Sequence, residues 1–191
     1  MAYGITSSSF LLSIGVPPAA ASASVHMAEV FTTAFSGLSH WKLGNVRGAL
    51  FKRLVLPGIV GSVIGAYVLT SIDGKLLRPW ISGYLLLMGL YVLVKAFRQI
   101  RIRTEPPTYI APLGLAGGFL DAAGGGGWGP VVTTSLLGGG SDPRSTIGSV
   151  NAAEFFVAVA SGVSFAVMGG FTTWVTIAGL IFGGLFAAPL A

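Results

Sequence analysis

Several long stretches of this chain carry no charged residue, among them residues 54–72, 122–141 and 155–191. A helix of about 20 apolar residues crosses a hydrocarbon core roughly 30 Å thick, so these stretches are long enough to supply several membrane spans. Only 9% of the residues are charged and the mean hydropathy is +0.81, whereas a soluble domain carries about 25% charged residues. The sequence therefore predicts an all-α, polytopic transmembrane helical bundle.

The net charge of +5 does not indicate nucleic-acid binding. The basic residues form short clusters between the apolar stretches, where lipid headgroups and the positive charge of cytoplasmic loops account for them. The chain has no cysteine, which excludes a disulfide framework, a thiolate metal site and a catalytic thiol. No basic segment precedes the first apolar run, so we expect no cleavable signal peptide. No nucleophile, base and orienting group fall together, so we expect neither an enzyme nor a cofactor.

An internal repeat with an offset of 125 residues aligns SVHMAEVF (24–31) with SVNAAEFF (149–156). Identical pairs at this offset include Gly4 with Gly129, Gly15 with Gly140, Pro18 with Pro143, Glu29 with Glu154 and Ser36 with Ser161. Apolar composition alone would match many Ala, Leu and Val positions, but not Glu, Pro and Ser in register. Two halves descended from one unit are typical of secondary transporters.

The repeat divides the chain into a first repeat at 1–97, a basic cytoplasmic linker at 98–108 and a second repeat at 109–191. Gly129 follows a helical stretch and a glycine run, whereas only three residues precede Gly4. We therefore expect the N-terminal part of the first repeat to be missing. The second repeat stops where the first continues, so we expect its C-terminal helices to be missing as well.

Two basic clusters set the predicted orientation. They are Lys42, Arg47, Lys52 and Arg53, and then Lys95, Arg98, Arg101 and Arg103 with only Glu105 beside them. Both clusters are expected on the cytoplasmic side, whereas residues 168–173, the repeat counterpart of the first cluster, are uncharged and expected outside. The same loop then lies on opposite sides in the two halves, which predicts inverted repeats. Residues 109–140 must start and finish in the cytoplasm, as a re-entrant hairpin or broken half-helices that turn at the glycines.

The glycine run GGGGWGP (124–130) marks this turn. A phosphate-binding loop would need Lys and Ser or Thr after its last glycine, which the sequence does not offer. Close helix packing by small residues stays open as an alternative. Four adjacent glycines, however, point all round a helix, and each costs roughly 1 kcal/mol relative to alanine. A helix broken inside the bilayer is tolerated where its free backbone groups meet protein or a water-filled cavity.

The helix that follows the glycines is predicted to bind an anion at its start. Its free amides and partial positive charge favour an anion, and Pro130 suits a first helical turn. Hydroxyl groups follow at matching positions of both halves, so two hydroxyl-rich helix starts are expected to face each other near the midplane. The candidate substrate-binding residues are Thr6, Ser7, Ser8, Gly126, Gly127, Trp128, Gly129, Thr133, Thr134 and Asn151.

Glu29 and Glu154 are related by the repeat and lie inside predicted spans, where a carboxylate is expensive and usually functional. His26 and Asn151 each precede one of them by three residues, on the same helix face. We expect Glu29 and Glu154, with His26, to carry protons or to act in gating; the alternative is that each glutamate only fixes a helix contact. Glu and His at this spacing can bind metal in helical bundles, but the second half has Asn151 instead of His, so we predict no metal site.

Residues 114–165, GLAGGFLDAAGGGGWGPVVTTSLLGGGSDPRSTIGSVNAAEFFVAVASGVSF, resemble the second-half motif of the TauE/SafE sulfite exporter family, also called toluene sulfonate uptake permeases. Residues 9–46 resemble its first half. The resemblance covers nearly the whole chain and implies about eight spans in two repeats. It also implies transport of sulfite, thiosulfate, sulfoacetate or organosulfonates across the bacterial cytoplasmic membrane.

The expected function is therefore a multi-pass secondary transporter of the bacterial cell membrane that moves small sulfur-containing anions, coupled to protons. A passive anion channel built on the same repeat is the alternative. The expected partners are a small anionic substrate and the lipid bilayer, with no nucleic acid; a homo-oligomer stays open. The residues favour a small oxyanion, and only the resemblance selects sulfur.

Overall fold

The computed structural model describes residues 3–97, 109–169 and 174–187, so the predicted linker and residues 170–173 lie outside the described residues. Within these ranges the chain is helical and contains no strand. The elements are α1 (Tyr3–Ser13), α2 (Pro18–Lys42), α3 (Gly48–Ser71), α4 (Gly74–Ala96), α5 (Ile110–Gly124), η1 (Trp128–Thr133, a π-helical segment), α6 (Thr134–Gly138), α7 (Pro143–Val167) and α8 (Trp174–Ala187).

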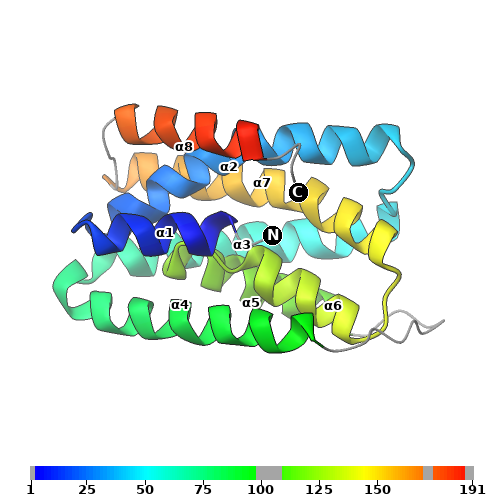
Figure 1. Ribbon diagram of the computed structural model, residues 1–191, viewed down its shortest axis with the longest axis horizontal. Helices are drawn as coiled ribbons and strands as arrows, with labels where there is room; N and C mark the ends of the chain where they lie inside the picture. The colour runs from blue at the N-terminus through cyan, green and yellow to red at the C-terminus, as the bar shows by residue number, and fades with distance from the viewer. Residues whose placement is uncertain (1–2, 98–108, 170–173, 188–191) are drawn as a thin grey trace.

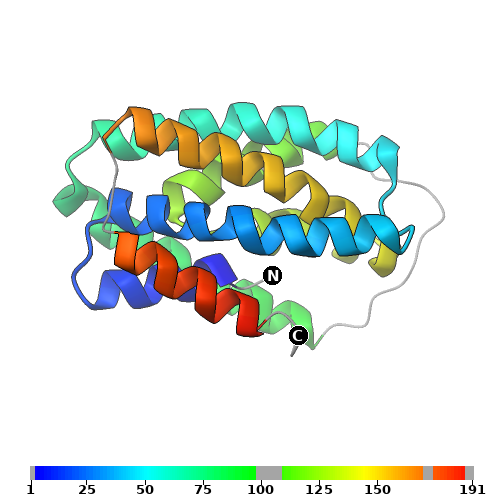
Figure 2. The ribbon, with the colours of Figure 1, turned by 90° about the horizontal axis from the view of Figure 1, so that it is seen from above.

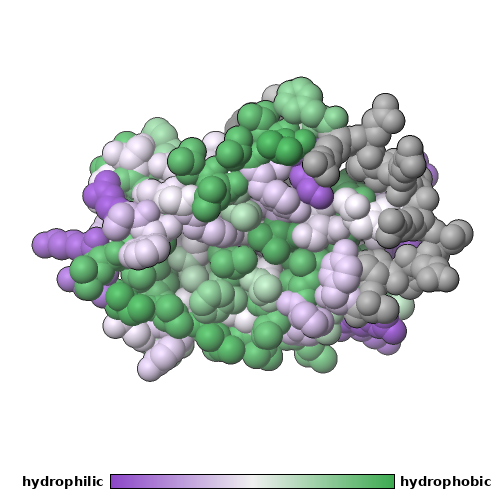
Figure 3. Space-filling model, turned by 90° about the horizontal axis from the view of Figure 1, so that it is seen from below, coloured by the Kyte–Doolittle hydropathy of each residue, from purple (hydrophilic) through white to green (hydrophobic). Residues whose placement is uncertain are grey.

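All the helices lie along one long axis, as Figures 1 and 2 show. Three described helices are long and apolar enough to cross a membrane: Gly48–Ser71, Gly74–Lys95 and Pro143–Val167. On the face in Figure 3, apolar and weakly polar side chains cover most of the middle, and the most hydrophilic ones lie mainly toward the two ends. The predicted all-α membrane bundle is confirmed.

The positive charge of the described residues gathers at one end of the bundle, where α2 and α4 end and α3 and α7 begin (Figure 1, right). This basic end carries Lys42, Arg47, Lys52, Arg53, Lys95 and Arg144. Asp142 is the carboxylate there; it caps α7 by accepting a hydrogen bond from the Ser145 N–H at 2.9 Å. This hydrogen bond, with the nearby arginines, lowers the pKa of Asp142.

Residues 109–140 form a re-entrant hairpin, as the sequence predicts. α5 runs inward from the basic end, the chain turns at 125–127, and η1 and α6 return (Figure 1). A Cβ added to Gly139 would lie 2.9 Å from the Tyr109 hydroxyl, and one on Gly138 would lie 2.7 Å from Lys95 Nζ. Both arms of the hairpin therefore meet the basic end of the molecule.

The helix boundaries recur at the offset of 125 residues. α2 and α7 each have 25 residues and begin at Pro18 and Pro143, and α1 begins at Tyr3 where η1 begins at Trp128. α2 and α7 run in opposite directions (Figure 2). They also approach closely, since a Cβ on Gly37 would lie 3.2 Å from the Cα of Ala152. These matches support the predicted inverted repeat.

Glycines outside the central run pack α3 against α5. A Cβ on Gly61 would collide with the carbonyl oxygen of Leu115, and one on Gly118 with the carbonyl oxygen of Gly58. Small residues allow membrane helices such close approach. Gly61 and Gly118 therefore serve close helix packing. This is the role that was considered as an alternative for the run at 124–127.

Two clusters of buried apolar side chains fill the bundle, one toward each end. The first includes Leu11, Val25, Leu69, Ala122 and Phe165. The second includes Leu54, Trp128, Val132, Leu136 and Val157. The chain passes from the first cluster to the second between Ala122 and Trp128, that is, through the glycine turn.

Candidate functional site

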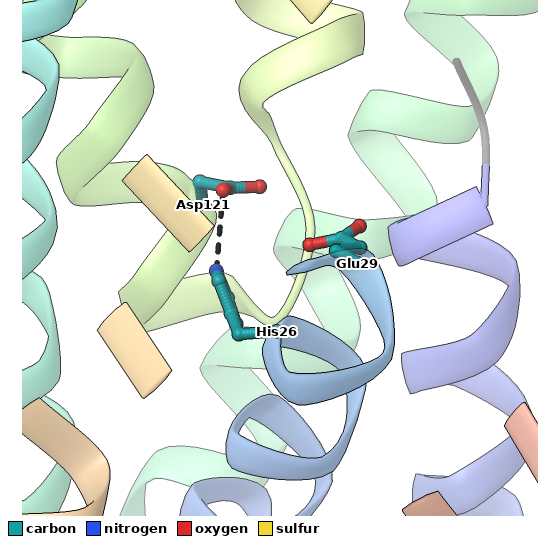
Figure 4. A group of neighbouring side chains, drawn as sticks. All are labelled: His26, Glu29 and Asp121. Atoms are coloured by element: carbon teal, nitrogen blue, oxygen red, sulfur yellow. Dashed lines mark hydrogen bonds and ion pairs between the residues drawn. The ribbon is translucent and has the colours of Figure 1, made fainter. Parts of the chain in front are cut away.

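A buried polar cluster lies beside the glycine turn, where the two apolar clusters meet. It consists of His26 and Glu29 from α2 and Asp121 from α5 (Figure 4). Their exposed fractions are 0%, 4% and 2%. The only ion-pair contact among the described residues lies here, between His26 and Asp121. Buried ionisable groups in a membrane span are expensive and usually mark function.

Asp121 ties the glycine turn to α2. Its Oδ1 accepts hydrogen bonds from the backbone N–H groups of Gly127, at 2.7 Å, and Trp128, at 2.9 Å, and its Oδ2 lies 3.2 Å from His26 Nε2. The backbone carbonyl of Asp121 also accepts from the N–H groups of Gly125 and Gly126. The carboxylate of Asp121 thus accepts the hydrogen bonds of the backbone amides at the start of η1.

His26 faces an acceptor at each ring nitrogen. Nδ1 lies 2.8 Å from the carbonyl oxygen of Ser22, and Nε2 faces Oδ2 of Asp121. A neutral imidazole has only one N–H, and the carbonyl oxygen of Ser22 can only accept. Nδ1 can donate to the Ser22 carbonyl oxygen, and Nε2 can donate to Oδ2 of Asp121 at the same time only when the imidazole carries both protons.

Glu29 supplies an unsatisfied carboxylate to this cluster. Its Oε2 has no hydrogen-bond partner among the described residues. A Cβ on Gly4 would lie 2.8 Å from Oε1, so the start of α1 lies directly against this carboxylate. The charged and titratable groups that act on Glu29 come from every neighbouring element: Tyr3 of α1, His26 of α2, Asp121 of α5 and Glu154 of α7.

The glycine run makes the turn possible for two reasons. Gly125 and Gly126 have φ values of +73° and +148°, which side-chain-bearing residues rarely adopt. Gly126 also touches the first turn of α1, since an added Cβ would lie 2.5 Å from the backbone of Gly4 and Ile5. The Ser8 hydroxyl donates to the carbonyl oxygen of Gly125. The starts of α1 and η1 therefore meet at this turn and lead away to opposite ends (Figure 1).

The predicted substrate-binding residues fall in several environments. Ser8, Gly126 and Gly127 lie at the turn. Thr6 lines a cavity of about 800 Å³ between α1 and α4. Thr133 is buried and its hydroxyl has no partner in the described structure, whereas Gly129 is buried beside it in η1 and Ser7 and Thr134 are half-buried.

Trp128 and Asn151 contact other helices. The Trp128 indole is fully buried in the second apolar cluster and donates to the carbonyl oxygen of Val150 at 3.1 Å. Asn151 Nδ2 donates to the Ser36 hydroxyl at 2.8 Å and so joins α7 to α2. Glu154 is half-buried and within electrostatic range of Asp121 and His26. The structure thus places ligand atoms of His26 and Glu29 within 4.8 Å of each other, with Glu154 within electrostatic range of Glu29.

Asp121 is the residue that sequence reasoning missed. A signal was present, because Asp121 is the only charged residue between positions 109 and 141 and stands just before the glycine run. A lone acid at membrane depth deserves a functional hypothesis.

Three described residues could hold a cation. His26, Glu29 and Asp121 each offer one ligand atom, and these atoms lie within 4.8 Å of one another. A metal would have to displace the contact between Nε2 and Oδ2, while Oδ1 already accepts two amide hydrogen bonds. Metal coordination would therefore require these side chains to give up contacts that they make in this structure.

The comparisons with known proteins agree on a family. The model of the family described as Sulfite exporter TauE/SafE matches residues 1–191. A curated relative, probable membrane transporter protein YtnM of Bacillus subtilis (strain 168), is 45% identical over 200 residues, which cover 100% of this chain and 67% of the relative. No solved structure matches the chain.

Proposed function

The chain belongs to the Sulfite exporter TauE/SafE family, and from that premise we propose that it is a secondary transporter that moves small sulfur-containing anions with protons. Family membership and the apolar helices make it a multi-pass membrane protein of a transporter family. Beyond family membership, we propose a substrate of the sulfite, thiosulfate, sulfoacetate or organosulfonate type. We also propose protons as the coupling ion.

One observation carries the proposal: two helix starts meet in the middle of the bundle beside a buried polar cluster. α1 and η1 begin there and diverge to opposite ends. Broken helices whose starts meet at the midplane of two repeats form the binding sites of many secondary transporters. A purely structural membrane subunit would gain nothing from a helix broken at this depth.

The proposed substrate site is the space around this turn, with hydroxyl donors from both halves. Ser8 and Thr133 occupy matching positions of the repeat, and both are buried. The amides of Gly127 and Trp128 are taken by Asp121 in this conformation. An anion that binds there must share them with Asp121 or replace its carboxylate.

Proton coupling follows from the charge of the same region. Glu29 and Glu154, when ionised, would bring negative charge into a low-dielectric interior, where a further anion is strongly unfavourable. Protons taken up by these carboxyls would offset the charge of the anion. Tyr3 and His26 are the other titratable groups that face Glu29.

The test is sulfite transport by the full chain in proteoliposomes with an imposed pH gradient. The double variant Glu29→Gln and Glu154→Gln keeps the side-chain shape and removes both titrations, so it should lose stimulation by the pH gradient. Asp73→Asn, at the exposed turn before α4, should behave like the unmodified protein. A double variant with unchanged rate and pH dependence would contradict the coupling mechanism.

The same vesicles separate a transporter from a passive anion channel. A transporter returns its binding site across the membrane, so unlabelled sulfite on the far side should stimulate uptake of labelled sulfite. Absence of this stimulation, with sulfite flux intact, would favour the channel.

A further inference from the structure

A second cavity lies at the basic end of the bundle, away from the glycine turn. It encloses about 440 Å³ between the end of α2, the start of α3 and the middle of α7, three helices that lie side by side in Figure 2. Its walls are apolar and largely aromatic, formed chiefly by Leu38, Trp41, Val46, Phe51, Phe155 and Phe156. Nothing in the proposed transport mechanism uses this cavity.

The aromatic rings form a continuous wall. Phe156 packs edge-on against both Phe51 and Phe155, with ring centroids 5.7 Å and 5.1 Å apart. Trp41 is 68% exposed. An indole at the end of a membrane helix prefers the interface between lipid tails and headgroups. The pocket therefore opens where lipid tails begin.

Three cations stand next to lining residues of this pocket in the sequence. Lys42, Arg47 and Lys52 directly follow the lining residues Trp41, Val46 and Phe51 in sequence, and all three are exposed. In the described ranges, no carboxylate lies within ion-pair distance of any of them. Arg47 donates to the Ser145 hydroxyl at 3.3 Å and so stays near α7.

We propose that this pocket binds one anionic phospholipid, with an acyl chain among the aromatic rings and the phosphate on Lys42, Arg47 and Lys52. The positive rim selects an anionic headgroup, because basic groups at this membrane depth attract anionic lipids. The apolar walls select a lipid, because a free anion would gain no contact from them. The proposal does not depend on the transport function.

Lipid tails brominated near the headgroup test the site, because bromine quenches a nearby indole. The protein is placed in phosphatidylcholine vesicles that contain a minor fraction of brominated phosphatidylglycerol or brominated phosphatidylcholine. The contribution of Trp41 is the difference between the unmodified protein and Trp41→Phe. Brominated phosphatidylglycerol should quench Trp41 at a several-fold lower fraction than brominated phosphatidylcholine.

Matched variants distinguish a specific lipid site at the pocket from general electrostatic attraction of anionic lipids to the basic end. The double variant Lys42→Gln and Lys52→Gln should lower the preference for phosphatidylglycerol by about fivefold to tenfold. Arg53→Gln with Lys75→Gln removes the same charge from exposed residues that do not directly follow a lining residue in the sequence, and should change the preference by less than about twofold. An equal loss in both double variants would overturn the proposal.

Two further arms test the pocket itself. Ala34→Phe, at a lining position, should fill the pocket and remove the preference of Trp41 quenching for brominated phosphatidylglycerol. An unchanged preference would show that the acyl chain lies elsewhere and would overturn the proposal. Soluble glycerol 3-phosphate should leave the quenching unaltered. If it displaces the lipid, the rim binds a free phosphate and the lipid proposal fails.

Discussion

At the scale of single residues, Asp121 connects the glycine turn to the neighbouring helices. Its carboxylate joins the glycine turn to α2, and its backbone carbonyl closes the end of α5. A helix start with free amides is a place for an anion, and here the chain supplies that anion itself. A substrate would meet a site whose backbone donors already have a partner.

Asp121→Ala should destabilise the protein strongly. It leaves the N–H groups of Gly127 and Trp128 and Nε2 of His26 without partners, and each unpaired buried group costs about 1–3 kcal/mol. Asp121→Asn keeps an oxygen for the amides but removes the carboxylate oxygen that faces Nε2 of His26. We therefore expect a fall in melting temperature of several degrees or more for Asp121→Ala and a smaller one for Asp121→Asn, measured by thermal unfolding in detergent.

The comparison between the two variants is the control. If Asp121→Asn were as unstable as Asp121→Ala, the contact with His26 would contribute more than the two amides. If neither lowered the melting temperature, the hydrogen bonds to the turn would not stabilise it.

At the scale of elements, glycines serve different purposes along the chain. Those at 125 and 126 allow backbone angles that turn the re-entrant hairpin, whereas those on α3 and α5 allow two helices to touch. Gly83 of α4 has no atom within 4 Å of the position of a Cβ. The same residue type is therefore essential in some helices and replaceable in another.

Gly118→Ala and Gly83→Ala should change stability in opposite directions. The new Cβ at 118 collides with the carbonyl oxygen of Gly58, which forces α3 and α5 apart; overpacking of this kind costs about 1–3 kcal/mol. The change at 83 meets open space and removes a flexible residue from a helix interior, worth up to about 1 kcal/mol. Thermal unfolding of the two variants under one condition measures both; a destabilised Gly83→Ala with an unaffected Gly118→Ala would refute the packing argument.

The whole molecule is electrically polar along its long axis. Most of the described cations gather at the end where both arms of the hairpin finish. The charged residues described at the opposite end are Asp73, Lys75 and Arg78, at the N-cap and in the first turns of α4. Cytoplasmic loops of membrane proteins are enriched in lysine and arginine. The basic end should therefore face the cytoplasm.

The absence of cysteine from the chain makes this orientation directly measurable. Leu43→Cys places a thiol at the basic end and Ile14→Cys places one at the other, at positions that are 72% and 61% exposed. In intact cells a membrane-impermeant thiol reagent should label only Ile14→Cys, and both after lysis. Labelling of Leu43→Cys in intact cells would reverse the assigned topology.

Much of this architecture followed from the sequence. Uncharged stretches longer than a membrane span, basic clusters between them and four adjacent glycines predicted an all-α bundle, its polarity and a hairpin at 109–140. These features are local, because hydrophobic length, charge and backbone freedom belong to short segments. The offset of 125 residues, found from residue identities alone, also relates the first residues of α2 and α7.

Only the tertiary structure decided which polar groups meet. His26 and Asp121 are 95 residues apart in sequence, and their contact depends on how α2 packs against α5. The tertiary structure also places Trp128 in the apolar core, and it pairs the amides at the start of η1 with the carboxylate of Asp121. Periodicity and composition identify which polar residues lie in the predicted helices, but not which residues they contact. A hydrogen bond depends on the distance and direction between two groups, and these are fixed only when the helices pack together.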